Sequence, residues 1–188
     1  AGDTLDKHLM INEAKVVASK FLKELSKYCK QVIVTLGNHE VNRNNLKRTS
    51  SIESLIKIIR DPKIKFLKTT GFFQDEIYND LIYCNWNFGD YKNPYIENKD
   101  EYDSLTKEGK FIIDLFHDPI YNSKNSEGKI FNDSTYLKVN DFKGDLLLLG
   151  DIHQRQFFNG ENGKIKGAYP SSLFQLNHGE SQDKHGLI

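Results

Sequence analysis

This chain of 188 residues has two cysteines, no net charge and no long apolar run. Each of these features excludes some classes of protein. The two cysteines, Cys29 and Cys84, have neither the spacing of a zinc site nor the density of a secreted disulfide scaffold. A reducing compartment is therefore expected, with cytoplasmic localisation. No apolar run reaches a membrane-spanning length and the first residues show no signal-peptide pattern, so we expect no membrane association.

The charge balance limits how the chain could meet a polyanion. Lys+Arg and Asp+Glu both number 26, so there is no global positive field to attract nucleic acid, and any such binding would have to be local. The hydrophobic share of 38% and aromatic share of 12% suffice for one core, which predicts a single domain over residues 1–188. Because a motif touches the first residues and no stop signal closes the last, we interpret the domain as truncated at both ends.

Alternating helical and strand patterns predict an α/β fold. Residues 11–28 and 51–60 have apolar residues at helical spacing, and the first of these helices is expected to bury one face. That face consists of Ile11, Ala14, Val17, Ala18, Phe21, Leu22 and Leu25. Apolar runs predict strands at residues 31–36, 64–68, 72–77, 81–86, 110–116 and 145–149. A turn at Asn159-Gly160 predicts a hairpin between residues 155–158 and 164–169.

The remaining segments complete the expected architecture. Residues 89–103 and 122–129 are polar and are expected to be loops, while residues 133–142 are expected to form a short helix. We therefore expect two packed mixed sheets flanked by helices, incomplete at the N-terminus.

Polar motifs follow several of the predicted strands, where open α/β sheets gather their sites. The motifs are Gly2-Asp3-Thr4-Leu5-Asp6, Gly37-Asn38-His39-Glu40, Phe116-His117-Asp118-Pro119 and Gly150-Asp151-Ile152-His153. Each residue alone also has a plain interpretation. Asp3 could be a helix cap or turn residue, His39 a surface residue and His117 a structural histidine at a strand end. Asp6 and Asp118 are interpreted as supporting or solvent-facing residues, and Glu40 could either orient His39 or face solvent.

These motifs, in this order, resemble those of calcineurin-like metallophosphoesterases. The resemblance implies that Asp3 bridges two metal ions and that Asn38, His117, Asp151 and His153 are further ligands. It also implies that His39 is not a ligand but a hydrogen-bond donor or general acid beside the phosphate, a role that suits an imidazole titrating near neutral pH. The cofactor implied is a pair of divalent ions.

The last metal motif departs from the family pattern. Asp151 occupies a position where Gly-His-x-His would have its first histidine. A carboxylate is a harder donor than imidazole, so the substitution favours Mn²⁺, with Mg²⁺ as the alternative, over softer ions.

The C-terminal stretch resembles the nuclease domain of the Mre11 and SbcD group, of phage and bacterial type. The similar segments are residues 168–175, residues 177–180 and His185-Gly186, with Ser171 where that group has glycine. His178 and His185 are interpreted as structural or surface residues. The resemblance implies action on DNA in repair or recombination and an ATPase partner of the Rad50 and SbcC type. A homodimer and a phage-encoded protein acting in the host cytoplasm stay open.

No Asp-x-His lies upstream of Asp3, where calcineurin-like metallophosphoesterases have their first metal motif. We therefore expect this chain to bind one metal ion far better than two. The function predicted is a metal-dependent DNA exonuclease or endonuclease. The alternatives are a phosphatase or small-substrate phosphodiesterase of the same fold, or a non-catalytic, metal-poor fragment.

Overall fold

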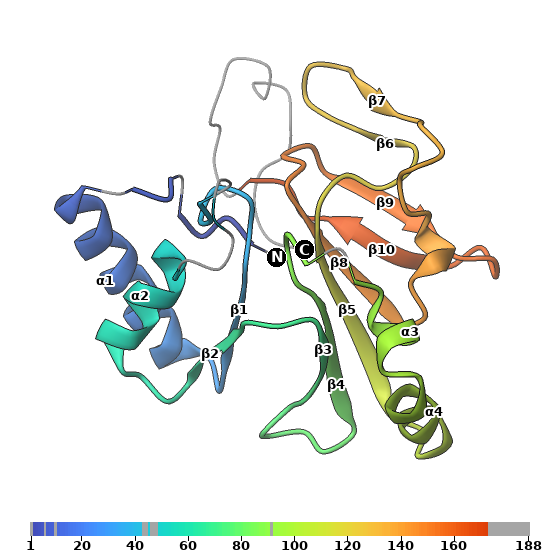
Figure 1. The fold of residues 1–188 in the computed structure, drawn as a ribbon, viewed down its shortest axis with the longest axis horizontal. Coiled ribbons are helices and arrows are strands. Elements are labelled where there is room, and N and C mark those ends of the chain that lie inside the picture. The colour runs from blue at the N-terminus through green and yellow to red at the C-terminus, as the bar shows by residue number, and fades with distance from the viewer. Residues whose placement is uncertain are drawn as a thin grey trace.

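The computed structural model describes residues 2–5, 7–9, 11–42, 45, 49–90 and 92–172. Within those ranges the strands form a parallel pair β1-β2, a six-stranded sheet in the order β3-β4-β5-β8-β10-β9, and a small pair β6-β7. Figure 1 shows β1 and β2 with helices α1 and α2 on one side of the molecule and the six-stranded sheet on the other. The expected α/β class, with a mixed sheet flanked by helices, is confirmed, while the smaller sheet of β1 and β2 is parallel.

The smaller sheet pairs β1 (Val32–Thr35) with β2 (Ile64–Leu67) and packs against α1 (Asn12–Tyr28) and α2 (Ser51–Ile59). Helix α2 starts after Ser50, whose side chain accepts a hydrogen bond from the Glu53 amide at 3.2 Å. Apolar side chains from both helices and both strands form one buried cluster. Its members are Leu5, Leu22, Val32, Val34, Ile52, Leu55, Ile59 and Ile64.

Helix α1 is in the predicted place, but it buries less of the predicted face. Leu22 and Ser26 are its buried residues, and Ala18 and Leu25 pack partly against the cluster. Ile11, Val17 and Phe21 are exposed. The small sheet offers room for only one edge of the apolar stripe. Ser26 belongs to the packed edge because its hydroxyl donates to Asp61 at 2.6 Å.

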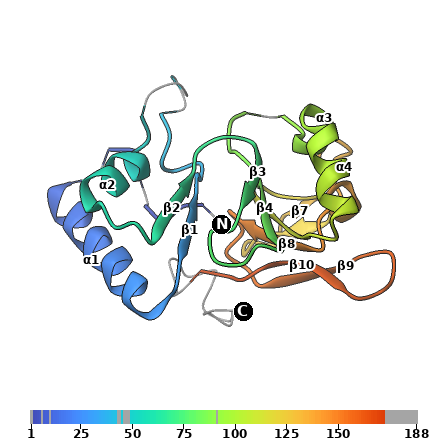
Figure 2. The same ribbon diagram turned by 90° about the horizontal axis from the view of Figure 1, so that it is seen from below.

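The larger sheet consists of β3 (Gly71–Gln74), β4 (Leu81–Trp86), β5 (Phe111–His117), β8 (Leu146–Gly150), β9 (Gln156–Asn159) and β10 (Ile165–Tyr169). Strands β4, β5, β8 and β10 are mutually parallel, and β3 and β9 run antiparallel at the two edges. The predicted hairpin is therefore β9-β10. Helices α3 (Pro94–Glu97) and α4 (Lys99–Lys107) lie over one face of this sheet (Figure 2).

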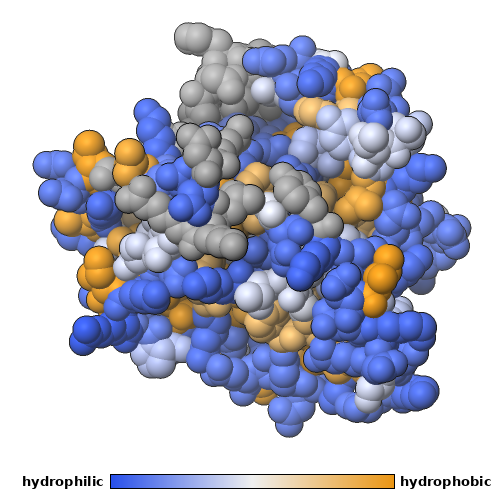
Figure 3. Space-filling model, viewed as in Figure 1, coloured by the Kyte–Doolittle hydropathy of each residue, from blue (hydrophilic) through white to orange (hydrophobic). Residues whose placement is uncertain are grey.

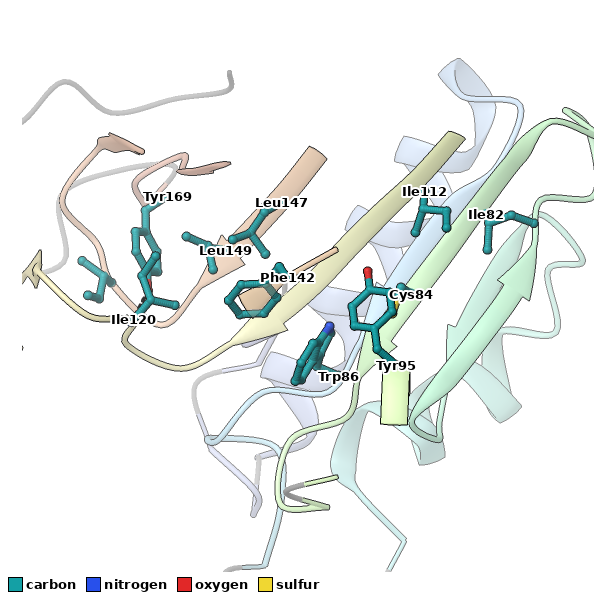
Figure 4. Close-up of a cluster of buried hydrophobic side chains, with 11 residues drawn as sticks. Ile82, Cys84, Trp86, Tyr95, Ile112, Ile120, Phe142, Leu147, Leu149 and Tyr169 are labelled. Atoms are coloured by element: carbon teal, nitrogen blue, oxygen red, sulfur yellow. Dashed lines mark hydrogen bonds between the residues drawn. The ribbon is translucent and has the colours of Figure 1, made fainter. Parts of the chain in front are cut away.

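The main core lies on that face, and the buried carboxylate of Asp114 packs against it. Trp86, Tyr95 and Phe142 pack together there (Figure 4). The buried Asp114 carboxylate accepts hydrogen bonds from Trp86 Nε1 and the Tyr95 hydroxyl, both at 2.8 Å, and from the Gly144 amide at 2.9 Å. Burial raises the pKa of Asp114, and these donors act against that effect.

Two sequence expectations on connecting segments are wrong. Residues 89–103 were expected to form a loop, but α3 and the start of α4 lie there, because Asn93 caps the Tyr95 amide and Pro94 is the first helical residue. Residues 133–142 form a 3₁₀ turn, η1 (Val139–Asp141), in place of the expected helix. The Asp133 side chain accepts from the Thr135 amide, a local bond that competes with helix formation.

Smaller differences concern the lengths of strands. Strand β3 ends at Gln74 because Asp75 turns the chain, and the expected loop at residues 122–129 includes β6 (Ser123–Lys124), which pairs with β7 (Ile130–Phe131). The visible surface is predominantly hydrophilic with scattered apolar residues (Figure 3). Within the described part of the chain, the helices are too short or too polar to cross a membrane.

Candidate metal centre

Polar side chains from four distant segments converge where β1, β5 and β8 end. One ligand atom each from Asp3, His117 and Asp151 lies within 4.8 Å of the others, and Asn38 Nδ2 donates to Asp151 Oδ1 at 2.7 Å. The sheet register explains part of this arrangement. His117 on β5 is opposite Gly150 on β8, so Asp151 follows at the same edge of the sheet.

Asp3 lies at the middle of the group. Its Oδ2 is 3.1 Å from His117 Nε2, and its Oδ1 accepts a hydrogen bond from the His39 amide at 3.0 Å. Burial acts to raise the pKa of Asp3, but the hydrogen bond and charge of His117, with the His39 amide, outweigh it and hold the pKa below its ordinary value. The site therefore favours the ionised carboxylate that a cation requires.

Two glycines allow this close approach of loops. A Cβ on Gly2 would lie 2.4 Å from His117 Nδ1, and a Cβ on Gly37 would lie 2.2 Å from Asp3 Oδ1. Gly2 also has a φ of +76°, which suits glycine. The glycines before Asp3 and Asn38 are therefore required by packing at the site itself.

Asn38 supplies the clearest sign that a group is meant to bind here. Its Oδ1 is buried and has no hydrogen-bond partner among the described residues. A buried amide oxygen without a partner is costly, and a divalent cation would satisfy it. Two carboxylates, one amide oxygen and one imidazole form a mixed oxygen and nitrogen donor set that suits a divalent cation.

Asp151 has a backbone conformation that residues other than glycine rarely adopt. Its φ is +81°, and Asp3 has a φ of +51°. Such conformations persist where the surrounding structure enforces them, and they cluster at functional sites. Burial raises the pKa of Asp151, with the nearby charge of Asp3 adding to this effect and His117 opposing it. A bound cation would relieve the repulsion between the two carboxylates.

His39 is placed at the rim. Its side chain is 47% exposed, and its Nε2 lies 4.0 Å from Asp3 Oδ2, whereas His117 is buried within the group. The exposed imidazole is accessible to a substrate while its own backbone amide fixes Asp3. This placement suits a proton donor beside the ligands.

Glu40 has a role that the sequence interpretation did not foresee. The sequence left open whether Glu40 faces solvent or orients His39, and the structure shows that it does not face solvent. The side chain is fully buried, and its carboxylate accepts from the Leu5 amide at 3.0 Å and the Gly37 amide at 2.8 Å. Burial raises the pKa of Glu40, and the two amides act against this. Glu40 thus joins the loops that carry Asp3 and Asn38.

The other predicted residues lie outside the ligand group or outside the described residues. His153 is near enough for its charge to act against the raised pKa of Asp151. It is not part of the group formed by Asp3, His117 and Asp151. Asp118 lies beside the site, and its backbone carbonyl accepts from the Tyr169 hydroxyl at 2.8 Å. Asp6, His178 and His185 lie outside the described residues.

Comparison with known proteins agrees with this geometry. A model of the calcineurin-like phosphoesterase family matches residues 1–155, so the chain belongs to that family of metal-dependent phosphoester hydrolases. The chain is also 33% identical over 175 residues to the uncharacterized protein R555 of Acanthamoeba polyphaga mimivirus. That match covers 92% of this chain and 12% of the viral protein, so the chain spans about an eighth of this relative's length.

Proposed function

We propose that this chain carries the catalytic centre of a metal-dependent phosphodiesterase that cleaves DNA. The observation that carries the hydrolase part is the group of Asp3, His117 and Asp151 joined by Asn38, whose buried Oδ1 lacks a partner among the described residues. Similarity of residues 168–172 and the following segment to the Mre11 and SbcD group supports DNA as the substrate. The same similarity supports an ATPase partner of the Rad50 and SbcC type.

In this proposal Asp3, Asn38, His117 and Asp151 hold the metal, with Mn²⁺ preferred. A divalent ion held by these residues would activate water as the nucleophile and would neutralise charge on the phosphate. The chain's own residues do the remaining work. Asp3 and Asp151 would coordinate the ion through their carboxylates, Glu40 fixes the spacing of the two loops, and His39 donates a proton to the leaving oxygen from the rim.

The substrate class is tested by comparing a labelled DNA duplex with a small nitrophenyl phosphate ester. The enzyme is assayed with Mn²⁺ on both, and a variant with Asp3→Asn serves as the inactive control. Cleavage of DNA with negligible hydrolysis of the small ester supports the nuclease. The reverse result would show a small-substrate phosphoesterase.

The metal preference rests on Asp151. We expect activity to be highest with Mn²⁺, because this ligand is a carboxylate in place of imidazole, and we expect Asp151→His to shift the optimum toward softer ions. Activity measured across a series of divalent ions checks this. An unchanged ranking of metals in the variant would remove Asp151 from the ligands.

A further inference from the structure

A cavity of about 470 Å³ is lined by Phe116 and Asp118, the two neighbours of the candidate ligand His117 in the chain. Its walls come from the end of β4 and the loop after it, from Phe116, Asp118 and Pro119 around the end of β5, and from residues 135–137. Phe88 on the wall places its ring 6.1 Å from the His117 ring at an interplanar angle of 83°. Phe88 therefore lines the cavity and also contacts His117, which connects the cavity with the candidate metal centre.

The lining combines aromatic rings with amides and a cation. Trp86, Phe88, Phe116 and Tyr136 supply the rings. Asn87 contributes a buried Oδ1 without a hydrogen-bond partner among the described residues, and the exposed Lys92 lies at the edge of the cavity. A purely apolar ligand would leave the amide oxygen and the cation unused. A planar heterocycle with donor groups on its edge would use the rings and the amide together.

The size and setting select one kind of occupant. A volume of this order accommodates one nucleoside but not a base pair in its duplex. The zero net charge of the chain means that contacts to nucleic acid have to be local, and stacking on aromatic rings is such a contact. We propose that this cavity receives the unstacked base of the nucleotide whose phosphate is cleaved, with Lys92 facing the adjacent backbone phosphate. The proposal rests on the function given above and specifies the substrate group that positions the ester.

Trp86 provides a direct measure of occupancy, because it is the chain's one tryptophan and it lines the cavity. We would titrate the chain with deoxyadenosine and, separately, with 2-deoxyribose while following tryptophan fluorescence in a buffer containing EDTA. Without metal or phosphate ester there is no turnover, so the measurement is independent of catalysis. We expect saturable quenching by deoxyadenosine at millimolar concentrations and none by the sugar.

Variants test whether deoxyadenosine binds in this cavity. Tyr136→Ala should weaken deoxyadenosine binding at least about fivefold, the low end of what one aromatic ring contributes to base stacking. Tyr136→Leu should weaken it similarly while retaining side-chain bulk, and Phe157→Ala, an exposed aromatic on β9 outside the cavity, should leave it unchanged. Equal quenching by base and sugar, no quenching, or unaltered affinity in both Tyr136 variants would overturn the proposal. Base binding without DNA cleavage would instead contradict the proposed function alone.

Discussion

Glu40 shows, at the scale of one residue, how a side chain that touches no ligand can set the geometry of the site. Its carboxylate accepts from the Leu5 and Gly37 amides and so ties together the loops of Asp3 and Asn38. An amide side chain cannot replace it, because its NH₂ group would face a backbone N–H in place of an acceptor.

We therefore expect Glu40→Gln to lower the free energy of unfolding by roughly 1–3 kcal/mol, the cost of leaving a buried donor unsatisfied. Metal affinity should fall with it, since the two loops lose their common anchor. Urea denaturation and calorimetric titration with Mn²⁺ measure the two effects. Glu24→Gln, an exposed residue paired with Lys27 on α1, is the matched control and should change neither. Equal effects of both variants would disprove the anchoring role.

His39 and His117 allow chemistry to be separated from metal binding. The His39 imidazole is at the rim, whereas His117 is buried among the ligands. His39→Ala should lower kcat by roughly 10²–10⁴ through loss of general-acid assistance while metal stoichiometry stays intact. His117→Ala should weaken metal binding. Rates at saturating Mn²⁺ together with bound-metal analysis distinguish the two, and equal metal loss in both variants would defeat this division of roles.

At the scale of elements, strands were easier to predict than the segments between them. Strand β4 has the predicted bounds because its run of apolar and aromatic residues is buried in the larger core. Helix α3 was missed because its stability comes from the Asn93 cap and from a hydrogen bond that the Tyr95 hydroxyl donates to Asp114. Asp114 lies on another element, further along the chain. A window of sequence contains the cap signal but not the distant partner.

The turn between β3 and β4 gives a prediction about pH. Asp75 is buried, and its carboxylate accepts from the Ile77 and Tyr78 amides, both at 2.7 Å, and from the Tyr83 hydroxyl at 3.0 Å. Burial acts to raise the pKa of Asp75, but these donors outweigh it and lower the pKa below its ordinary value of 3.8. The carboxylate therefore stabilises the fold above pH 3.8, and this contribution is lost as the pH falls through the lower pKa of the folded state.

Asp75→Asn should accordingly cost roughly 1–2 kcal/mol of stability at neutral pH, because charge-assisted hydrogen bonds become neutral ones. The difference from the unmodified chain should shrink in strongly acidic buffer. Urea denaturation at several pH values provides the measurement. Asp80→Asn is the control, since this carboxylate lies in the same hairpin and is exposed. A difference that stays constant with pH would mean that the charge of Asp75 contributes nothing.

At the scale of the whole molecule, the order and direction of the strands bring the residues of the site together. The order of its motifs along the chain was visible in the sequence, and the parallel register of β5 and β8 then places His117 and Asp151 together. The sequence could not show that His153 lies outside the ligand group or that Glu40 is buried. Both depend on how loops from separate strands pack. The cavity beside His117 likewise needs walls from three distant segments.

The arrangement of charge predicts the metal stoichiometry of this chain. Asp3 and Asp151 are the carboxylates within the ligand group, and together they balance one divalent cation. A second cation would add two uncompensated positive charges at close range, with His153 outside the group. We expect calorimetric titration with Mn²⁺ to give one tight site per chain.

Asn38→Ala is the informative variant for this prediction, because it removes a neutral ligand and leaves the charge of the site unchanged. It should weaken the single site without altering the stoichiometry, and Asn140→Ala, a surface amide at η1, should have no effect. Two tight sites would contradict the charge balance. A further carboxylate would then have to join the ligands, and Asp6, which lies outside the described residues, would be the first position to test by Asp6→Asn.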